Sequence, residues 1–185
     1  MTCMTGPHHS SRRIDTALRI LFWGAAAALL LAPALAMRAG AEGVNWTAED
    51  FVFAAVLLGI VGIAFEVTMR LSRSWTYRFA AGFAVAAGFL IVLANAAVGM
   101  IADGPNAYNL SFVGVVGLAL LGAIVARFRA GYMAVVMLGA GLAHLSIAVA
   151  GMEVDQLGGI FSAGFGALWL VSAGLFRWAA AEHRG

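Results

Sequence analysis

Long apolar runs, interrupted at short intervals by polar residues, dominate the chain. A helix needs about 20 apolar residues to cross the roughly 30 Å hydrocarbon core of a bilayer, because each residue rises about 1.5 Å. Six runs are long enough, and they predict spans at about residues 20–37, 51–69, 79–101, 110–126, 130–152 and 157–176. The runs are continuous and do not alternate, which excludes β-barrel strands. The predicted fold is an all-α, polytopic transmembrane helix bundle with short loops.

The composition supports this fold class. The chain of 185 residues is 63% hydrophobic and 11% charged, whereas soluble domains are roughly 45–50% apolar and about 25% charged. Lipid tolerates such a surface and water does not, so the bilayer is the first expected partner. The formal net charge of +2 is small and scattered, which excludes the dense basic face of a nucleic-acid-binding protein.

The loops indicate an orientation. One set of loops and both ends hold almost all the arginines, and the other set holds one arginine and most of the acidic residues. The first set contains Arg12, Arg13, Arg19, Arg70, Arg73, Arg78, Arg127, Arg129, Arg177 and Arg184; the second contains Arg38, Glu42, Glu49, Asp50, Asp103, Glu153 and Asp155. The positive-inside rule then predicts a cytoplasmic tail at residues 1–19, a membrane domain at 20–176 and a cytoplasmic tail at 177–185.

The first apolar run has a second interpretation. Residues 12–36 also have the basic start, the apolar centre and the small residues before Met37 that are typical of a cleaved secretory signal. The alternative is a membrane helix that ends near Pro33. Cleavage would leave five spans and would not change the orientation of the later ones.

Small residues are expected to form the contacts between helices. Gly, Ala and Ser let helix backbones approach closely in lipid, where the hydrophobic effect does not drive association. Ser162 and Gly166 lie one turn apart in the sixth span, and Gly88, Asn95 and Gly99 lie near one stripe of the third. We predict that both sets pack against neighbouring helices.

Two ionisable residues lie inside the predicted spans, where a charge is costly and is therefore a functional candidate. Glu66 is near the cytoplasmic end of the second span. It is either a proton or cation site, or the partner of Arg70, which follows four residues later on the same face. His144 is in the outer half of the fifth span. It is either a site residue or a histidine hydrogen-bonded to a neighbouring helix.

A third intramembrane polar residue, Asn95, lies in the outer half of the third span. Because an unsatisfied amide in lipid costs several kcal/mol, Asn95 needs a partner, either in a polar pocket with His144 or on a backbone carbonyl or serine of another helix. If Glu66, Asn95 and His144 form an intramembrane polar site, Asp50, Asn106 and Asn109 are the candidates for its outer mouth.

Recognisable catalytic chemistry is missing from the sequence. The chain has no phosphate-binding glycine loop, no zinc-binding histidine pair and one cysteine, Cys3. A single intramembrane histidine does not supply the two axial ligands usual for haem between membrane helices. We therefore predict no catalytic residue, no metal, no cofactor and no enzymatic activity.

The residues between about Ala34 and Ala180 resemble a family of small uncharacterised multi-pass inner-membrane proteins of proteobacteria. The resemblance lies in residues 44–46, 50–51, Glu66, 95–99, Asn106, 109–110, 122–128, 167–169 and 175–177. Its members carry two adjacent acids where this chain has Gly104 and Pro105, and a glutamine where His144 stands. The resemblance implies an inner-membrane location and a retained first span. It implies no particular activity.

Three hypotheses about function follow. The first is a non-enzymatic accessory or scaffold protein that binds another membrane protein or itself. The second is a small transporter or channel that uses Asn95 and His144 from outside and Glu66 from inside. The third, a membrane enzyme or redox protein, has the least support, since one intramembrane histidine and one terminal cysteine offer little to bind a cofactor.

Overall fold

The computed structural model describes residues 8–72 and 74–182, which form six helices and no strand. The helices are α1 (His8–Arg38), α2 (Ala48–Leu71), α3 (Trp75–Ala97), α4 (Ala107–Val125), α5 (Ala130–Gly151) and α6 (Gln156–Glu182). Each is long and apolar enough to cross a membrane. The six-span, all-α fold predicted from the apolar runs is therefore confirmed, and the chain is a multi-pass membrane protein.

Several helix ends differ from the expected spans, and three of the differences have a local reason. Helix α3 ends at Ala97, whereas its span was expected to continue to Ile101, because Gly99 adopts a left-handed backbone with φ of 77°. Helix α1 already includes residues 8–19, which were expected to be a tail, since no glycine or proline interrupts them. Helix α6 continues past Phe176 through a run of alanines, which are strong helix formers.

The chain divides into two compact units, an N-terminal unit up to Met69 and a C-terminal unit from Arg70 onward. In the N-terminal unit, α1 and α2 meet through large side chains. The rings of Phe22 and Phe65 stack with centroids 4.5 Å apart, and Trp23 lies over Gly62, which has no side chain to displace it. Helix α1 passes through Pro33 without ending there; membrane helices tolerate proline where neighbouring groups satisfy the freed carbonyl.

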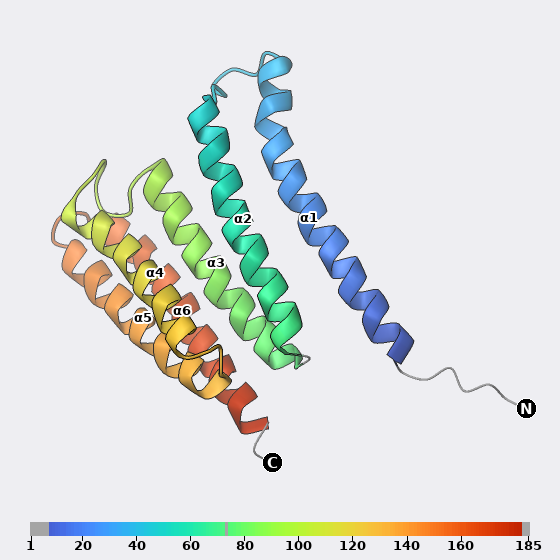
Figure 1. Cartoon of the computed structure of the whole chain (residues 1–185). Helices are drawn as coiled ribbons and strands as arrows, with labels where there is room; N and C mark the ends of the chain where they lie inside the picture. The colour runs from blue at the N-terminus through green and yellow to red at the C-terminus, as the bar shows by residue number, and fades with distance from the viewer. Residues whose placement is uncertain (1–7, 73, 183–185) are drawn as a thin grey trace, which may run out of the picture. The chain divides into compact units, whose positions relative to one another are not determined.

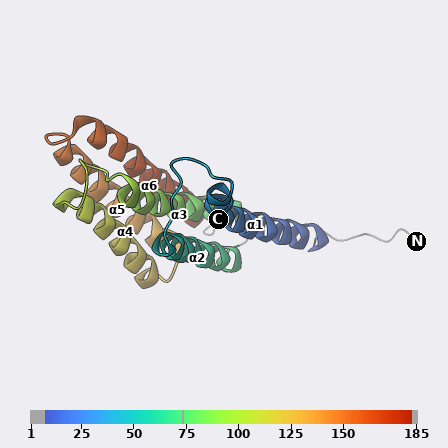
Figure 2. The ribbon, with the colours of Figure 1, turned by 90° about the horizontal axis from the view of Figure 1, so that it is seen from above.

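The C-terminal unit is a four-helix bundle. Contacts join α3 to α4, α4 to α5, α5 to α6 and α6 back to α3, so the four helices close a ring. Figures 1 and 2 show α5 and α6 running side by side, with α3 and α4 completing the group. The fully buried side chains between them are mostly small or aromatic, including Ala80, Ala87, Phe112, Ala148 and Phe176. Short connections between neighbours give the alternating up-and-down topology usual for such bundles.

Glycines set the close approach of α5 and α6. A Cβ placed on Gly141 of α5 would lie 2.6 Å from the side chain of Leu170, and one on Gly166 of α6 would lie 2.7 Å from Leu145. On each of the two helices, a leucine of the other helix thus packs against a glycine. Ser162 is fully buried in the same interface. The prediction that Ser162 and Gly166 form a helix-packing surface is confirmed.

Gly159 of α6 lies close to the backbone of α5. A Cβ there would lie 2.8 Å from the backbone oxygen of Ala148 on α5. Backbone cannot move aside as a flexible side chain can, so Gly159→Ala should destabilise the bundle by about 1–3 kcal/mol. Gly164→Ala is the matched control on the same helix, because a Cβ there meets nothing within 4 Å.

Thermal unfolding of the purified protein in mild detergent measures the effect. The control should be neutral or slightly stabilising, because alanine is favoured over glycine in a helix by roughly 0.5–1 kcal/mol. Equal unfolding midpoints for the two variants would contradict the α5–α6 packing described above.

Candidate functional site

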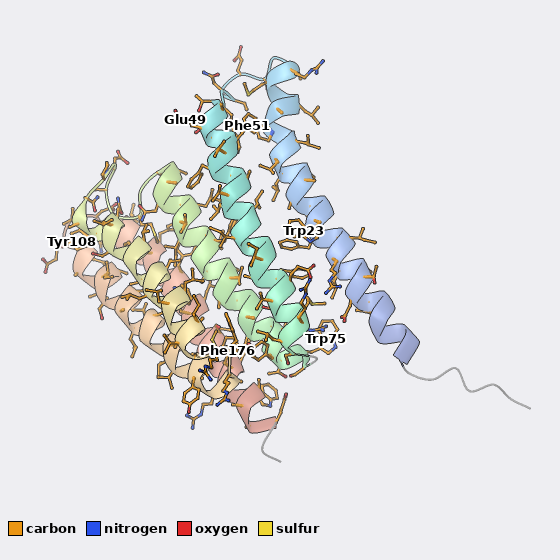
Figure 3. All side chains as sticks on the ribbon, viewed as in Figure 1. Trp23, Glu49, Phe51, Trp75, Tyr108 and Phe176 are labelled. Atoms are coloured by element: carbon orange, nitrogen blue, oxygen red, sulfur yellow. The ribbon has the colours of Figure 1, made fainter. Side chains whose placement is uncertain are left out.

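The loop between α3 and α4, residues 98–106, folds back into the end of the C-terminal unit. Its Met100 and Ile101 are 2% and 0% exposed, as buried as any core residue. The backbone turns through left-handed positions at Gly99, Ala102 and Gly104, with φ of 77°, 51° and 79°. The loop thus brings irregular backbone, with N–H and C=O groups outside any helix, into a buried place. Figure 3 shows this end of the unit beside the labelled Tyr108 of α4.

The side chain of Asn109 binds this loop from inside. Its Oδ1 accepts hydrogen bonds from the backbone N–H groups of Met100 and Ile101, both at 2.9 Å. Its Nδ2 donates to the backbone oxygens of Gly104, at 2.9 Å, and Ala102, at 3.3 Å. Only one orientation of the amide fits two donors and two acceptors in this way. One buried side chain therefore satisfies four backbone groups of the loop.

Two further asparagines complete the arrangement. Asn106 precedes α4; its Oδ1 accepts from the N–H of Asn109 at 2.9 Å, and its Nδ2 donates to the oxygen of Ile101 at 2.7 Å. Asparagine is favoured at this N-cap position because its oxygen binds a free N–H of the first turn. Asn95 of α3 donates from Nδ2 to the backbone oxygen of Asn109 at 2.5 Å. We call Asn95, Asn106 and Asn109 the asparagine cluster.

The loop is also joined to α6 and, through it, to α5. The hydroxyl of Ser162 donates to the backbone oxygen of Met100 at 3.3 Å. The backbone oxygen of the same Ser162 lies 3.0 Å from Nε2 of His144. A continuous path of hydrogen bonds and covalent backbone therefore runs from Asn95 on α3, through Asn109 and the loop, to His144 on α5.

The partner of His144 fixes its tautomer. A carbonyl oxygen can only accept, so Nε2 carries the proton and Nδ1 presents a lone pair. The imidazole is fully buried, and its ring centroid lies 4.5 Å from that of Phe112. Within the part of the chain that the structure describes, Nδ1 has no hydrogen-bond partner, and neither has the buried Nε1 of Trp169. These two atoms are the unused polar groups of the bundle interior.

Asp155 forms a second link between the loop and α6. It lies between α5 and α6, and its carboxylate accepts from the N–H of Gly158 at 2.9 Å and from the N–H of Ala102 at 3.2 Å. These hydrogen bonds, that of Gly158 first, lower the pKa of Asp155 below its ordinary value of 3.8. The ionised form of Asp155 therefore caps α6 and holds the loop together.

The remaining candidates lie in the N-terminal unit. Glu66 is paired with Arg19 of α1, with Oε2 and the guanidinium nitrogen 3.2 Å apart. An ion pair between two helices is thus present at Glu66. Asp50 accepts from the backbone N–H of Thr47 at 2.7 Å and from its hydroxyl at 2.9 Å. These two bonds fasten the first turn of α2.

The structure brings some of the predicted site residues together. Asn95, Asn106, Asn109 and His144 belong to one network in the C-terminal unit, whereas Glu66 and Asp50 belong to the N-terminal unit. Asn95 and His144 both bind backbone oxygens, which is the alternative to a shared polar pocket considered for each. Ser111 and Ser146 donate to backbone oxygens of their own helices, those of Ala107 and Leu142.

Sequence reasoning missed three contributors. Ser162 was recognised for its size and not for its hydroxyl, and Ser172, which donates to the oxygen of Ala80 at 2.8 Å, was not singled out. Arg19 was counted as a loop charge, although it lies four residues before Trp23 on the face of α1 that meets α2. Buried serines at helix-packing positions and an arginine just before a span are the features that could have indicated them.

The described residues contain no group of three or more His, Cys, Asp or Glu side chains that could hold a metal ion. Comparison of the chain with protein-family models, with curated proteins and with solved structures found no match. The asparagine cluster binds backbone, Asp155 caps a helix, and the lone pair of His144 is a buried hydrogen-bond acceptor.

The lowered pKa of Asp155 predicts an acid dependence. A carboxylate whose pKa is lower in the folded state contributes stability above its unfolded pKa and loses it as the pH falls through the folded pKa. Asp155→Asn should therefore unfold at a lower temperature than the wild type between roughly pH 5 and 8, and the difference should shrink as the pH falls below about 4 and through the lowered pKa of Asp155. Thermal unfolding across this range measures it.

Asp103→Asn is the control for this prediction. Asp103 is an exposed acid of the same loop whose carboxylate makes no hydrogen bond within the described residues. Its replacement should leave the unfolding midpoint unchanged at every pH. An Asp155→Asn difference that persists undiminished into acid would contradict the role given to the ionised carboxylate.

Proposed function

We propose that the protein is a non-enzymatic accessory or scaffold protein of the bacterial inner membrane, with both termini in the cytoplasm. The observation that carries the proposal is the use of polar side chains inside the C-terminal unit. Asn95, Asn109, Ser162, Ser172 and Nε2 of His144 all bind backbone groups of the protein itself. A transport path would instead present such groups to a passing substrate.

The packing of the C-terminal unit supports the same proposal. Its four helices are held at close range by glycines and alanines, and the irregular loop at one end is fixed by the asparagine cluster. A bundle of this kind offers a fixed outer surface to a partner in the membrane. The location and orientation follow from the alternation of arginines and from the resemblance to small inner-membrane proteins, and they are part of the proposal.

A small transporter or channel is the second candidate, and one observation favours it. The lone pair of His144 and the N–H of Trp169 are buried without partners, and such groups commonly bind an internal water. In the N-terminal unit, Glu66 is a carboxylate within a span. A hydrated path lined by His144, or one lined by Glu66, would make the second candidate the better description.

The test is a mild-detergent purification from the native membrane, with mass spectrometry of everything that co-purifies. The proposal predicts a partner protein at fixed stoichiometry. It also predicts that the purified chain in liposomes gives proton and cation flux no greater than empty liposomes, both as wild type and as Glu66→Gln.

Glu49→Gln is the matched control for the flux experiment, because Glu49 is an exposed acid in the first turn of the same helix α2. Flux in the wild type that disappears in Glu66→Gln and persists in Glu49→Gln would overturn the scaffold proposal and support the transporter.

A further inference from the structure

The turn between α4 and α5, residues 126–129, has a strained backbone. Arg127 and Phe128 are consecutive non-glycine residues with φ of 48° and 56°. The left-handed conformation costs an ordinary L-residue roughly 1–2 kcal/mol. Such strain persists only where surrounding contacts determine it, and it concentrates at functional positions.

Specific contacts hold the turn in this conformation. The hydroxyl of Tyr77 on α3 donates to the backbone oxygen of Phe128 at 2.7 Å. The N–H groups of Arg127 and Phe128 donate back to Ile124 and Ala123, at 2.9 Å and 3.2 Å. The ring of Tyr77 also contacts that of Phe176 on α6, with centroids 5.1 Å apart. Tyr77 thus ties the turn to α6.

Three arginines are neighbours in sequence of the two residues that Tyr77 contacts, Phe128 and Phe176. Arg127 and Arg129 flank Phe128, and Arg177 follows Phe176, the residue of α6 that contacts Tyr77. All three are exposed. Within residues 8–72 and 74–182, none of them is paired with a carboxylate. Figure 3 shows nitrogen-bearing side chains gathered at this end of the C-terminal unit, around the labelled Phe176.

Glu182, the acidic residue of α6 nearest to these arginines in sequence, already makes hydrogen bonds within the protein. The carboxylate of Glu182 accepts from the hydroxyl of Thr76 at 2.9 Å and from that of Ser74 at 3.2 Å. It therefore joins the end of α6 to the start of α3. The three guanidinium groups are left available for an anion from outside the chain.

Apolar surface adjoins the arginines. Val125, Tyr132 and Trp178 are 82%, 61% and 63% exposed. They lie on α4, α5 and α6, next to the residues that carry the charges. Tyrosine and tryptophan are enriched where a membrane protein meets the lipid headgroups. A ligand that touches both kinds of surface needs a negatively charged group joined to hydrocarbon.

We propose that Arg127, Arg129 and Arg177 form a binding site for the headgroup of an anionic phospholipid, and that Tyr77 positions two of these arginines by holding the turn. The phosphate accepts hydrogen bonds from the guanidinium groups, which match its geometry better than an ammonium does. The acyl chains lie against the exposed apolar residues. The site requires only that this end of the bundle lie at a lipid headgroup layer, so it holds in either orientation of the chain.

The experiment uses the full-length protein, purified and delipidated in mild detergent. Cardiolipin, phosphatidylglycerol, phosphatidylcholine or inorganic phosphate is added, and native mass spectrometry and thermal unfolding record binding. The anionic lipids should bind and raise the unfolding midpoint, whereas phosphatidylcholine and inorganic phosphate should not. Each of Arg127→Gln, Arg129→Gln and Arg177→Gln should weaken anionic-lipid binding about fivefold, the effect expected for one arginine at a charged headgroup layer.

Two further variants separate a built site from general positive charge. Arg38→Gln removes an exposed arginine of α1 and should leave lipid binding unchanged. Tyr77→Phe keeps every charge and removes the hydrogen bond to Phe128, so it should weaken binding by a factor between about two and ten. Each variant is compared with its own lipid-free state, so a loss of stability is not read as a loss of binding.

Several results would overturn the proposal. They are unchanged lipid binding in the arginine variants, equal stabilisation by inorganic phosphate or by phosphatidylcholine, and an equal loss of binding in Arg38→Gln. If a glutamine variant does not fold, the lysine variant at the same position replaces it. Lysine keeps the charge and loses the planar fork, so it should bind anionic lipid more weakly than the wild type; binding as strong as the wild type would contradict the site.

Discussion

The amide of Asn109 meets the demand that burial places on irregular backbone. A buried N–H or C=O group needs a hydrogen-bond partner, and each one left without a partner costs several kcal/mol. Helices meet this demand internally, but the loop between α3 and α4 does not. Asn109 supplies two acceptor and two donor bonds to that loop from a single buried side chain. Met100 and Ile101 can be buried because their N–H groups are satisfied in this way.

The rest of the C-terminal unit is organised around the buried loop. The hydroxyl of Ser162 on α6 donates a hydrogen bond to the backbone oxygen of Met100 in this loop. The backbone oxygen of Ser162 in turn accepts one from Nε2 of His144 on α5. Asp155 joins the same loop to the start of α6. At the opposite end, Tyr77 performs a comparable task by binding the strained turn at Phe128. Both ends of the bundle are thus fixed by side chains that bind the backbone of a connection.

The sequence predicted the number and type of the spans because a continuous apolar run of about 20 residues can be accommodated in lipid only as a membrane-spanning helix. It also identified most of the polar residues of the network, since polar residues in spans are few. It could not indicate how they are joined. Apolar spans carry almost no periodicity, so the rotation that turns Ser162 toward Met100, or Arg19 toward Glu66, cannot be read from spacing. Likewise, nothing in the run up to Ile101 distinguishes helix from buried loop except Gly99 and the asparagines after it.

Hydrogen–deuterium exchange at the amides of Met100 and Ile101 tests the role of Asn109 most directly. In the wild type these amides should exchange far more slowly than those of an ordinary loop, because both bind Oδ1 of Asn109. In Asn109→Ala they should exchange rapidly, whereas Ser111→Ala, which removes a bond within α4 only, should leave them protected. Rapid exchange in the wild type, or equal protection in the wild type and Asn109→Ala, would contradict the account.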